Sequence, residues 1–182
     1  MNQSVKTPGV QHASMSIVLH WVSALLVVLL WTIGQTVDWV PDGPLRVDYR
    51  SVHIALGATL GFVLVTRLTW RVTKGGLLPA LDTGLLLVVA RITHWALYGL
   101  MFVTVTLGAS NAWVRGDSIF NLFTIPQLAP GERALTRLIG GWHALGANAL
   151  LIVVGLHTAA ALFHHYVLRD ATLRRMLPWG RP

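Results

Sequence analysis

The sequence predicts an all-α integral membrane protein, a single membrane domain folded as a four-helix bundle. Hydrophobic residues make up 54% of the 182-residue chain and charged residues only 12%, against about 25% charged in an average soluble domain. The charges lie between four long apolar stretches, each close to the roughly 20 residues that cross a bilayer. This composition argues against a soluble enzyme. Basic residues placed between apolar runs also argue against nucleic acid as a partner.

Four transmembrane helices are expected, in order along the chain. The first belongs to a stretch, 7–37, without any charged residue, and it is longer than a signal-peptide core, so we expect it to stay in the chain. The second is short and extends past Arg67, whose side chain can reach the headgroups. The third has Arg91 near its start. The fourth is charge-free over 138–168, which predicts tilt. Together they cover approximately residues 15–37, 51–71, 84–113 and 139–168.

Both chain termini are expected on the cytoplasmic side of the membrane. Four spans place the termini on one side, together with the connection between the second and third helices. That side carries nine basic residues and two acids, whereas the opposite side carries five of each. Because an excess of Lys and Arg marks the cytoplasmic side, the topology follows from the charge distribution.

Histidines are the residues most able to carry chemistry here. The chain has 8 histidines, 7 carboxylates and no cysteine. Ionisable groups inside a membrane are costly and mark functional sites. The spans offer no thiol or carboxylate to complete a zinc or copper site, and covalent haem needs cysteine. Non-covalent haem b, which needs two axial imidazoles, fits best. Seven histidines lie in the spans or at the end of the fourth: His20, His53, His94, His143, His157, His164 and His165.

The spacing of these histidines predicts two haem sites at different depths. His143 and His157 are 14 residues apart, so they share a helix face to within about 40° and are separated by about 21 Å. With the topology above, His53 starts the second helix level with His143. His20 starts the first helix level with His157. We therefore expect two haems b, one held by His53 and His143 and the other by His20 and His157.

Two other histidines leave alternatives open. His164 is 21 residues from His143 and returns to about the same face, so it competes with His157 as the partner of His20. Its position nearer the headgroups would deprive a haem of apolar surroundings. His94 lies about mid-span, at a depth where no partner is evident. A structural or pocket-lining role is favoured for it over a role as ligand.

Small and basic residues near the histidines are compatible with haem without requiring it. Gly57 and Gly61 follow His53 at i+4 and i+8 and either leave room for a macrocycle or allow close helix packing. Arg67 and Arg71 are candidate contacts for haem propionates. Anionic lipid explains these two arginines as well.

Five strings in the chain have a recognisable pattern: SIVLHW at 16–21, HIALG at 53–57, RLTWR at 67–71, WHALGAN at 142–148 and GLHTAAALFHHY at 155–166. They resemble the prokaryotic cytochrome b561 family, and the resemblance extends from about residue 14 to residue 178. The family pattern places haem ligands at the positions of His20, His53, His143 and His157, in agreement with the depth argument.

The resemblance implies a protein of the bacterial inner membrane that carries electrons to or from the ubiquinone pool. Some members are regarded as oxidising periplasmic superoxide and reducing ubiquinone, so a superoxide:ubiquinone oxidoreductase is one expected activity. His164 and His165, with Tyr166, stand where a quinone headgroup would meet the cytoplasmic interface, and histidine titrates near neutral pH. These residues are candidates for a quinone or proton site, and simple anchoring of the helix is the alternative.

Other partners and functions stay open at this point. Arg115, Arg133 and Arg137 are candidates for steering an anion such as superoxide, although the charges on their side sum to zero. A haem-bearing membrane anchor for a peripheral dehydrogenase or hydrogenase is the main alternative function. A metal transporter is disfavoured by the lack of carboxylates inside the spans. A redox partner and a homo-oligomer are both compatible with the sequence.

Overall fold

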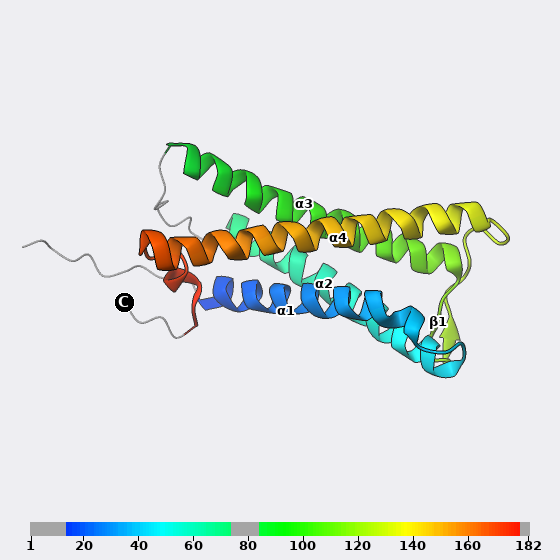
Figure 1. Ribbon diagram of the computed structural model, residues 1–182. Coiled ribbons are helices and arrows are strands. Elements are labelled where there is room, and N and C mark those ends of the chain that lie inside the picture. The colour runs from blue at the N-terminus through cyan, green and yellow to red at the C-terminus, as the bar shows by residue number, and fades with distance from the viewer. Residues whose placement is uncertain (1–13, 74–83, 179–182) are drawn as a thin grey trace, which may run out of the picture.

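The computed structural model describes residues 14–73 and 84–178, which form a bundle of four long helices (Figure 1). All four are long and apolar enough to cross a membrane, so the protein is an all-α membrane bundle. We name its two ends by what they carry. The hairpin end holds the loop after α3, and the tail end holds the segment after α4. The helices are α1 (Ser14–Thr36), α2 (Pro44–Thr73), α3 (Gly84–Arg115) and α4 (Arg133–Phe163).

Two helices begin before the apolar stretches that predicted them. Helix α2 starts at Pro44 rather than near residue 51, and α4 starts at Arg133 rather than near residue 139. Proline suits the first helical turn because the N–H it lacks would have no partner there. The first turns of both helices carry charged side chains, so these turns extend the helices beyond their apolar segments.

A small hairpin after α3 caps the start of α2. Strands β1 (Ser118–Ile119) and β2 (Phe123–Thr124) pair antiparallel. Phe120 and Asn121 between them have φ values of 49° and 56°, the left-handed conformation of a tight hairpin turn. The fully buried hydroxyl of Ser51 accepts the Phe120 N–H at 2.8 Å and donates to the Val47 carbonyl at 2.7 Å. Ser51 therefore fixes the hairpin to α2.

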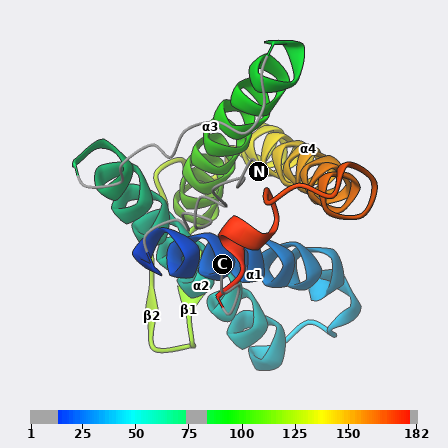
Figure 2. The ribbon, with the colours of Figure 1, turned by 90° about the vertical axis from the view of Figure 1, so that its left-hand side faces the viewer.

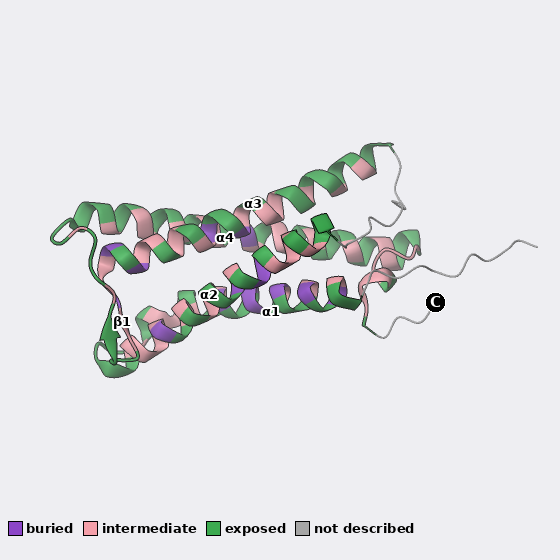
Figure 3. Ribbon diagram, turned by 180° about the vertical axis from the view of Figure 1, so that it is seen from behind, coloured by how far each residue is buried: buried purple, intermediate pink, exposed green. Residues whose placement is uncertain are grey.

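The packed core is aliphatic and lies mainly between α1 and α2 (Figure 3). Leu26, Leu30, Leu60 and Leu64 belong to it, whereas Leu150 is the one residue of α4 that is fully buried among the described residues. Many other large apolar side chains point outward, as expected for a surface that faces lipid. Helix α4 thus contributes few buried aliphatic side chains to the interior of the bundle. Its histidines lie on the side that faces this interior.

The tail end is closed by the segment that follows α4. The helix continues as a π-helical turn, η2 (His164–Leu168), and a short 3-10 helix, η3 (Arg174–Met176), comes after it. Arg169 between them is left-handed, with φ 54°. The indole N–H of Trp21 donates to the Met176 carbonyl at 2.7 Å. The segment is thereby attached to the start of α1, across the end of the bundle (Figure 2).

Candidate functional site

Four of the sequence-predicted histidines form two close pairs. The ring centres of His53 and His143 lie 6.1 Å apart, and those of His20 and His157 lie 6.2 Å apart. The first pair joins α2 to α4 toward the hairpin end, and the second joins α1 to α4 toward the tail end. The structure therefore brings together the same partners that the depth argument pairs.

Both separations fit two imidazoles on opposite sides of one iron. A metal ion binds an imidazole nitrogen at about 2 Å, and each nitrogen lies about 1 Å from its ring centre, given ordinary covalent bond lengths. Two axial imidazoles should then have ring centres about 6 Å apart. In the described part of the chain, no three His, Cys, Asp or Glu side chains converge as they would around a bare metal ion. Pairs of histidines are the arrangement that the axial positions of haem require.

The pair at the hairpin end has ring nitrogens available for such a ligand. The Nδ1–H of His143 donates to the Thr104 carbonyl at 3.0 Å, which leaves Nε2 with its lone pair free for a metal. This is the arrangement usual for ligating histidines, whose second nitrogen is held by a carbonyl or carboxylate. Nδ1 of His53 is buried and makes no hydrogen bond by distance and angle, although the Leu30 backbone lies close enough to the ring to act as an acceptor.

A cavity of ≈ 460 Å³ opens between the four helices beside this pair, and both rings line it. Glycines make room for the rings. A Cβ on Gly108 would lie 2.9 Å from Cε1 of His143, and one on Gly34 would lie 3.4 Å from Cε1 of His53. A larger residue at position 108 would displace the His143 ring. The cavity has the size of a small-molecule site and is bounded by the two candidate ligands.

Gly57 and Gly61, which the sequence leaves undecided between two roles, differ in their surroundings. A Cβ on Gly57 would meet nothing within 4 Å, and Gly57 lines the cavity. A Cβ on Gly61 would lie 3.2 Å from Cγ1 of Val105. Gly57 therefore leaves open space beside the ring pair, whereas Gly61 allows close packing of α2 on α3.

The pair at the tail end has a different hydrogen-bond arrangement. Arg67 lies within hydrogen-bond distance of His20, with Nη2 3.1 Å from Nδ1. A guanidinium only donates, so Nδ1 accepts and the ring proton resides on Nε2. A ligating histidine carries its proton on the nitrogen away from the metal. Ligation through Nε2 of His20 therefore requires Arg67 to leave Nδ1. The guanidiniums of Arg67 and Arg71 both lie over the ring of Tyr98. The ring centre is 5.2 Å from Cζ of Arg67 and 5.8 Å from Cζ of Arg71.

His94 has a close histidine neighbour, contrary to the expectation that none lies at its depth. Its ring centre is 5.5 Å from that of His157, which places His157 beside both His94 and His20. The sequence does not predict this contact, because depth can be inferred from residue position only if the helices are parallel. Helix α3 instead runs at an angle to α4 (Figure 1).

His164 pairs with a carboxylate from the tail. Its Nδ1 lies 2.5 Å from Oδ2 of Asp170, whose Oδ1 accepts the Thr172 N–H at 2.8 Å. Burial acts to raise the pKa of Asp170, but the hydrogen bonds from His164 and Thr172 outweigh burial and lower that pKa below its ordinary value. The adjacent His165 has a buried Nδ1 without a hydrogen-bond partner in the described chain, and its ring contacts Tyr166 at 4.8 Å.

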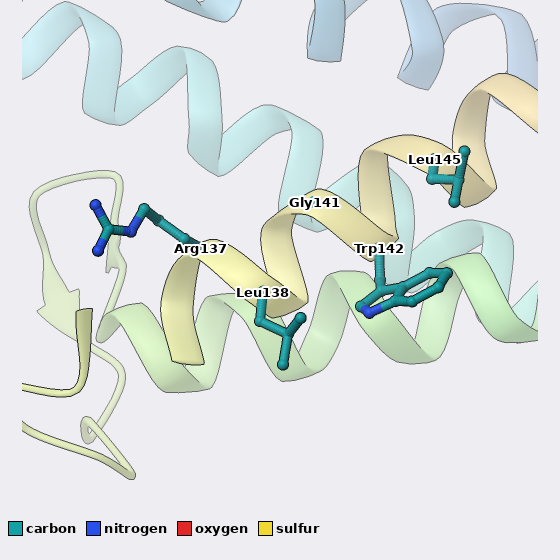
Figure 4. A pocket seen from close by; sticks show the side chains of 5 residues that line it. All are labelled: Arg137, Leu138, Gly141, Trp142 and Leu145. Atoms are coloured by element: carbon teal, nitrogen blue, oxygen red, sulfur yellow. The ribbon is translucent and has the colours of Figure 1, made fainter. Parts of the chain in front are cut away.

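Charged groups at the hairpin end include one that the sequence does not single out. Asp117, only 7% exposed, lies 3.2 Å from Arg50 and 3.4 Å from Arg115, and all three line the cavity. Arg50 precedes His53 by three residues, so helical periodicity puts both on one face. Arg137, expected to steer anions, lies elsewhere. It borders a shallow groove on the outer face of α4 with Trp142 (Figure 4).

Comparison with known proteins assigns the family. The family model described as prokaryotic cytochrome b561 matches residues 11–179. The chain belongs to this family. It is similar to the probable superoxide oxidase CybB of Yersinia pestis, 29% identical over 175 residues, which cover 94% of this chain and 98% of that protein.

Two further relatives cover nearly the whole chain. Cytochrome b561 homolog 2 of Escherichia coli is 29% identical over 178 residues, or 92% of this chain and 91% of the relative. Cytochrome b562 of Cereibacter sphaeroides is 28% identical over 176 residues, or 93% and 96%. The protein is accordingly a membrane cytochrome of electron transport, and membership of the family implies b-type haem.

Proposed function

We propose that this cytochrome holds two haems b and carries electrons through the bilayer between the hairpin end and the tail end. His53 and His143 would hold one haem, and His20 and His157 the other. The observation that carries the proposal is the presence of two histidine pairs with ring centres about 6 Å apart, at opposite halves of one bundle. Haem supplies reversible one-electron ferric–ferrous chemistry when bound.

Residues around the pairs have definite tasks in this proposal. The Thr104 carbonyl holds the Nδ1–H of His143, which would leave Nε2 to ligate the iron. At the tail end, Arg67 would release Nδ1 of His20 and would bind a propionate carboxylate, for which a guanidinium has matching donors. Arg71, stacked on the same tyrosine ring, is the second candidate for a propionate.

The charges support an orientation with the tail end in the cytoplasm. Arginines clearly outnumber acids among the described residues of that end, and such an excess marks the cytoplasmic side of an inner-membrane protein. The hairpin end, with its balanced charges, would then face the periplasm. A quinone headgroup would bind near His164, His165 and Tyr166 at the tail end.

We propose ubiquinone as the acceptor and superoxide as the donor. The similarity to a probable superoxide oxidase of Yersinia pestis supports superoxide as donor, and a bundle whose surface faces lipid supports a lipid-soluble quinone as acceptor. The reaction balances when two superoxide anions each lose one electron and leave as O₂. The quinone gains both electrons and two protons and becomes quinol. A membrane anchor for a peripheral dehydrogenase would show haem but no such activity as an isolated chain.

Haem counting on histidine variants tests the proposed sites. The purified chain would be compared with His53→Ala, His157→Ala and the control His94→Ala by pyridine haemochrome and reduced-minus-oxidised spectra. We expect two haems b per chain, with about one lost in each of the first two variants and none in the control. One haem per wild-type chain, or loss confined to His94→Ala, contradicts the pairing. Superoxide-driven reduction of a soluble ubiquinone analogue then tests donor and acceptor.

A further inference from the structure

The tail end has one carboxylate among its described residues, and it is bonded to a histidine. The carboxylate of Asp170 contacts Nδ1 of His164 at 2.5 Å. Its electrostatic partners are His164 and Thr172, and no arginine is among them. The described arginines of this end are Arg67, Arg71, Arg91, Arg169, Arg174 and Arg175.

The backbone is built to make this contact. Helix α4 widens into the π-helical turn that begins at His164, and such turns occur frequently at functional sites. The chain then reverses through the left-handed Arg169, and the Asp170 N–H donates to the His164 carbonyl at 3.2 Å. The Thr172 N–H holds the second carboxylate oxygen. Two backbone hydrogen bonds and an unusual φ angle thus fix the carboxylate beside the ring.

The pair connects water with the interior of the bundle. The side chain of Asp170 is 27% exposed and that of His164 only 13%. His164 follows His157 by seven residues, so it lies on about the same face of α4 and about 10 Å farther toward the tail. It stands between a candidate haem ligand and the aqueous surface, where a quinone headgroup would receive electrons.

We propose that His164 and Asp170 form the pair that delivers protons to a quinone at the tail end. This inference rests on the proposed function. For each electron that the quinone receives, the protonated ring of His164 gives the proton on Nε2 to a quinone oxygen, breaking an N–H bond and forming an O–H bond. Two such transfers complete the quinol, and water returns each proton to the ring. Asp170 is the positioning residue, which holds Nδ1–H and offsets the positive charge of the ring.

Other charged and titratable groups at this end set the surroundings of the pair. The charged groups at this end are the six arginines named above and Asp170, whose carboxylate contacts Nδ1 of His164 and is placed to balance a positive charge on that ring. The other titratable side chains come from three helices and the π-helical turn: His20 on α1, His94 on α3, His157 on α4, and His165 and Tyr166 on η2.

Comparing two oxidants of the reduced holoprotein tests the proposal. Haems reduced with dithionite would be mixed with decylubiquinone, which takes up protons, or with ferricyanide, which does not, and haem oxidation would be followed across pH 5.5–8.5. The variants are Asp170→Asn and His164→Gln. The control is Asp48→Asn, which makes the same chemical change at the hairpin end, where Asp48 accepts a hydrogen bond from Asn121. Haem content of every variant is measured first.

We expect quinone to oxidise both tail variants more slowly by on the order of 100-fold or more, as for loss of a positioned general acid. The rates of oxidation by quinone should also lose the pH dependence seen in the wild type. The rates of oxidation by ferricyanide should equal those of the wild type. Equal slowing with both oxidants would mean a structural role and would overturn the inference, as would rates and pH profiles like those of the wild type. Loss of haem in His164→Gln would show that His164 is a haem ligand and would also overturn the inference. If quinone fails to oxidise even the wild-type haems, the proposed quinone activity itself is wrong.

Discussion

The Nδ1–H of His143 on α4 donates to the main-chain carbonyl of Thr104 on α3 at 3.0 Å. The acceptor belongs to the backbone, so it does not depend on the side chain at position 104. The two helices approach closely here because Gly146 and Gly108 lack side chains. A Cβ on Gly146 would lie 2.9 Å from Oγ1 of Thr104. The orientation of the candidate ligand is therefore set by helix packing.

If the proposed function is right, Gly108→Ala should remove the haem at the hairpin end. The added Cβ would lie 2.9 Å from Cε1 and 3.3 Å from Nδ1 of His143, so the ring must turn away from Thr104. We expect the haem content to fall by about half. Gly99→Ala on the same helix is the matched control, because its Cβ would meet nothing within 4 Å. Pyridine haemochrome measures both variants, and an unchanged haem content in Gly108→Ala would exclude His143 as a ligand.

Alanine at Gly57 and at Gly61 should have opposite effects on binding and stability. Gly57→Ala adds a methyl group to the open cavity, so haem affinity should fall while the thermal stability of the haem-free protein is kept. Gly61→Ala presses on Val105 at 3.2 Å, so the haem-free protein should unfold at a lower temperature. Haem titration and thermal unfolding of both variants separate the two effects. Normal haem binding by Gly57→Ala would show that the macrocycle lies elsewhere.

Ser51→Ala should weaken the attachment of the hairpin to α2 and leave the haem content unchanged. The substitution leaves the Phe120 N–H without its 2.8 Å acceptor at a part-buried position, which costs on the order of 1 kcal/mol. Faster hydrogen exchange at the Phe120 amide would report the change. Ser110→Ala serves as control, because that exposed hydroxyl only donates to a carbonyl of its own helix, at Thr106. Equal exchange rates in the two variants would refute the anchoring role of Ser51.

The tail should detach from α1 in acid. The pKa of Asp170 is lower in the folded protein than its ordinary value, so its contribution to stability is full above the ordinary Asp pKa of about 3.9 and is lost as the pH falls through the lower folded value. Because Met176 accepts the Trp21 N–H, tryptophan fluorescence should shift between pH 5 and pH 2.5. Asp170→Asn should lack this shift, and its persistence in the variant would assign it to another group.

The sequence predicts the four helices and the two histidine pairs because both follow from simple periodicity. Apolar length identifies a span, and a 14-residue spacing fixes the relative depth and face of His143 and His157. These arguments need only the regular geometry of a helix. The same geometry also anticipates that glycines lie near the rings, although the separate roles of Gly57 and Gly61 depend on what faces each across the bundle.

The remaining features depend on departures from regular geometry. Asp170 meets His164 only because a non-glycine residue, Arg169, adopts a left-handed conformation, for which the local sequence gives no signal. The contact between His94 and His157 depends on the angle of α3. The turn at Phe120 and Asn121 uses two positive φ angles without a glycine, so it escapes the usual hairpin signature.

Leu150 lies midway between His143 and His157 on α4, and with Leu30 and Leu60 it belongs to the aliphatic core that also lines the cavity. These aliphatic side chains offer no hydrogen-bonding group that could pass a proton across the layer. Under the proposed function, electrons cross this layer and protons enter only from the tail end. Turnover would then be electrogenic. Each electron that crosses the whole membrane toward a negative interior would work against about 2.3 kcal/mol per 100 mV of membrane potential, so the energised state of the cell would slow the cytochrome.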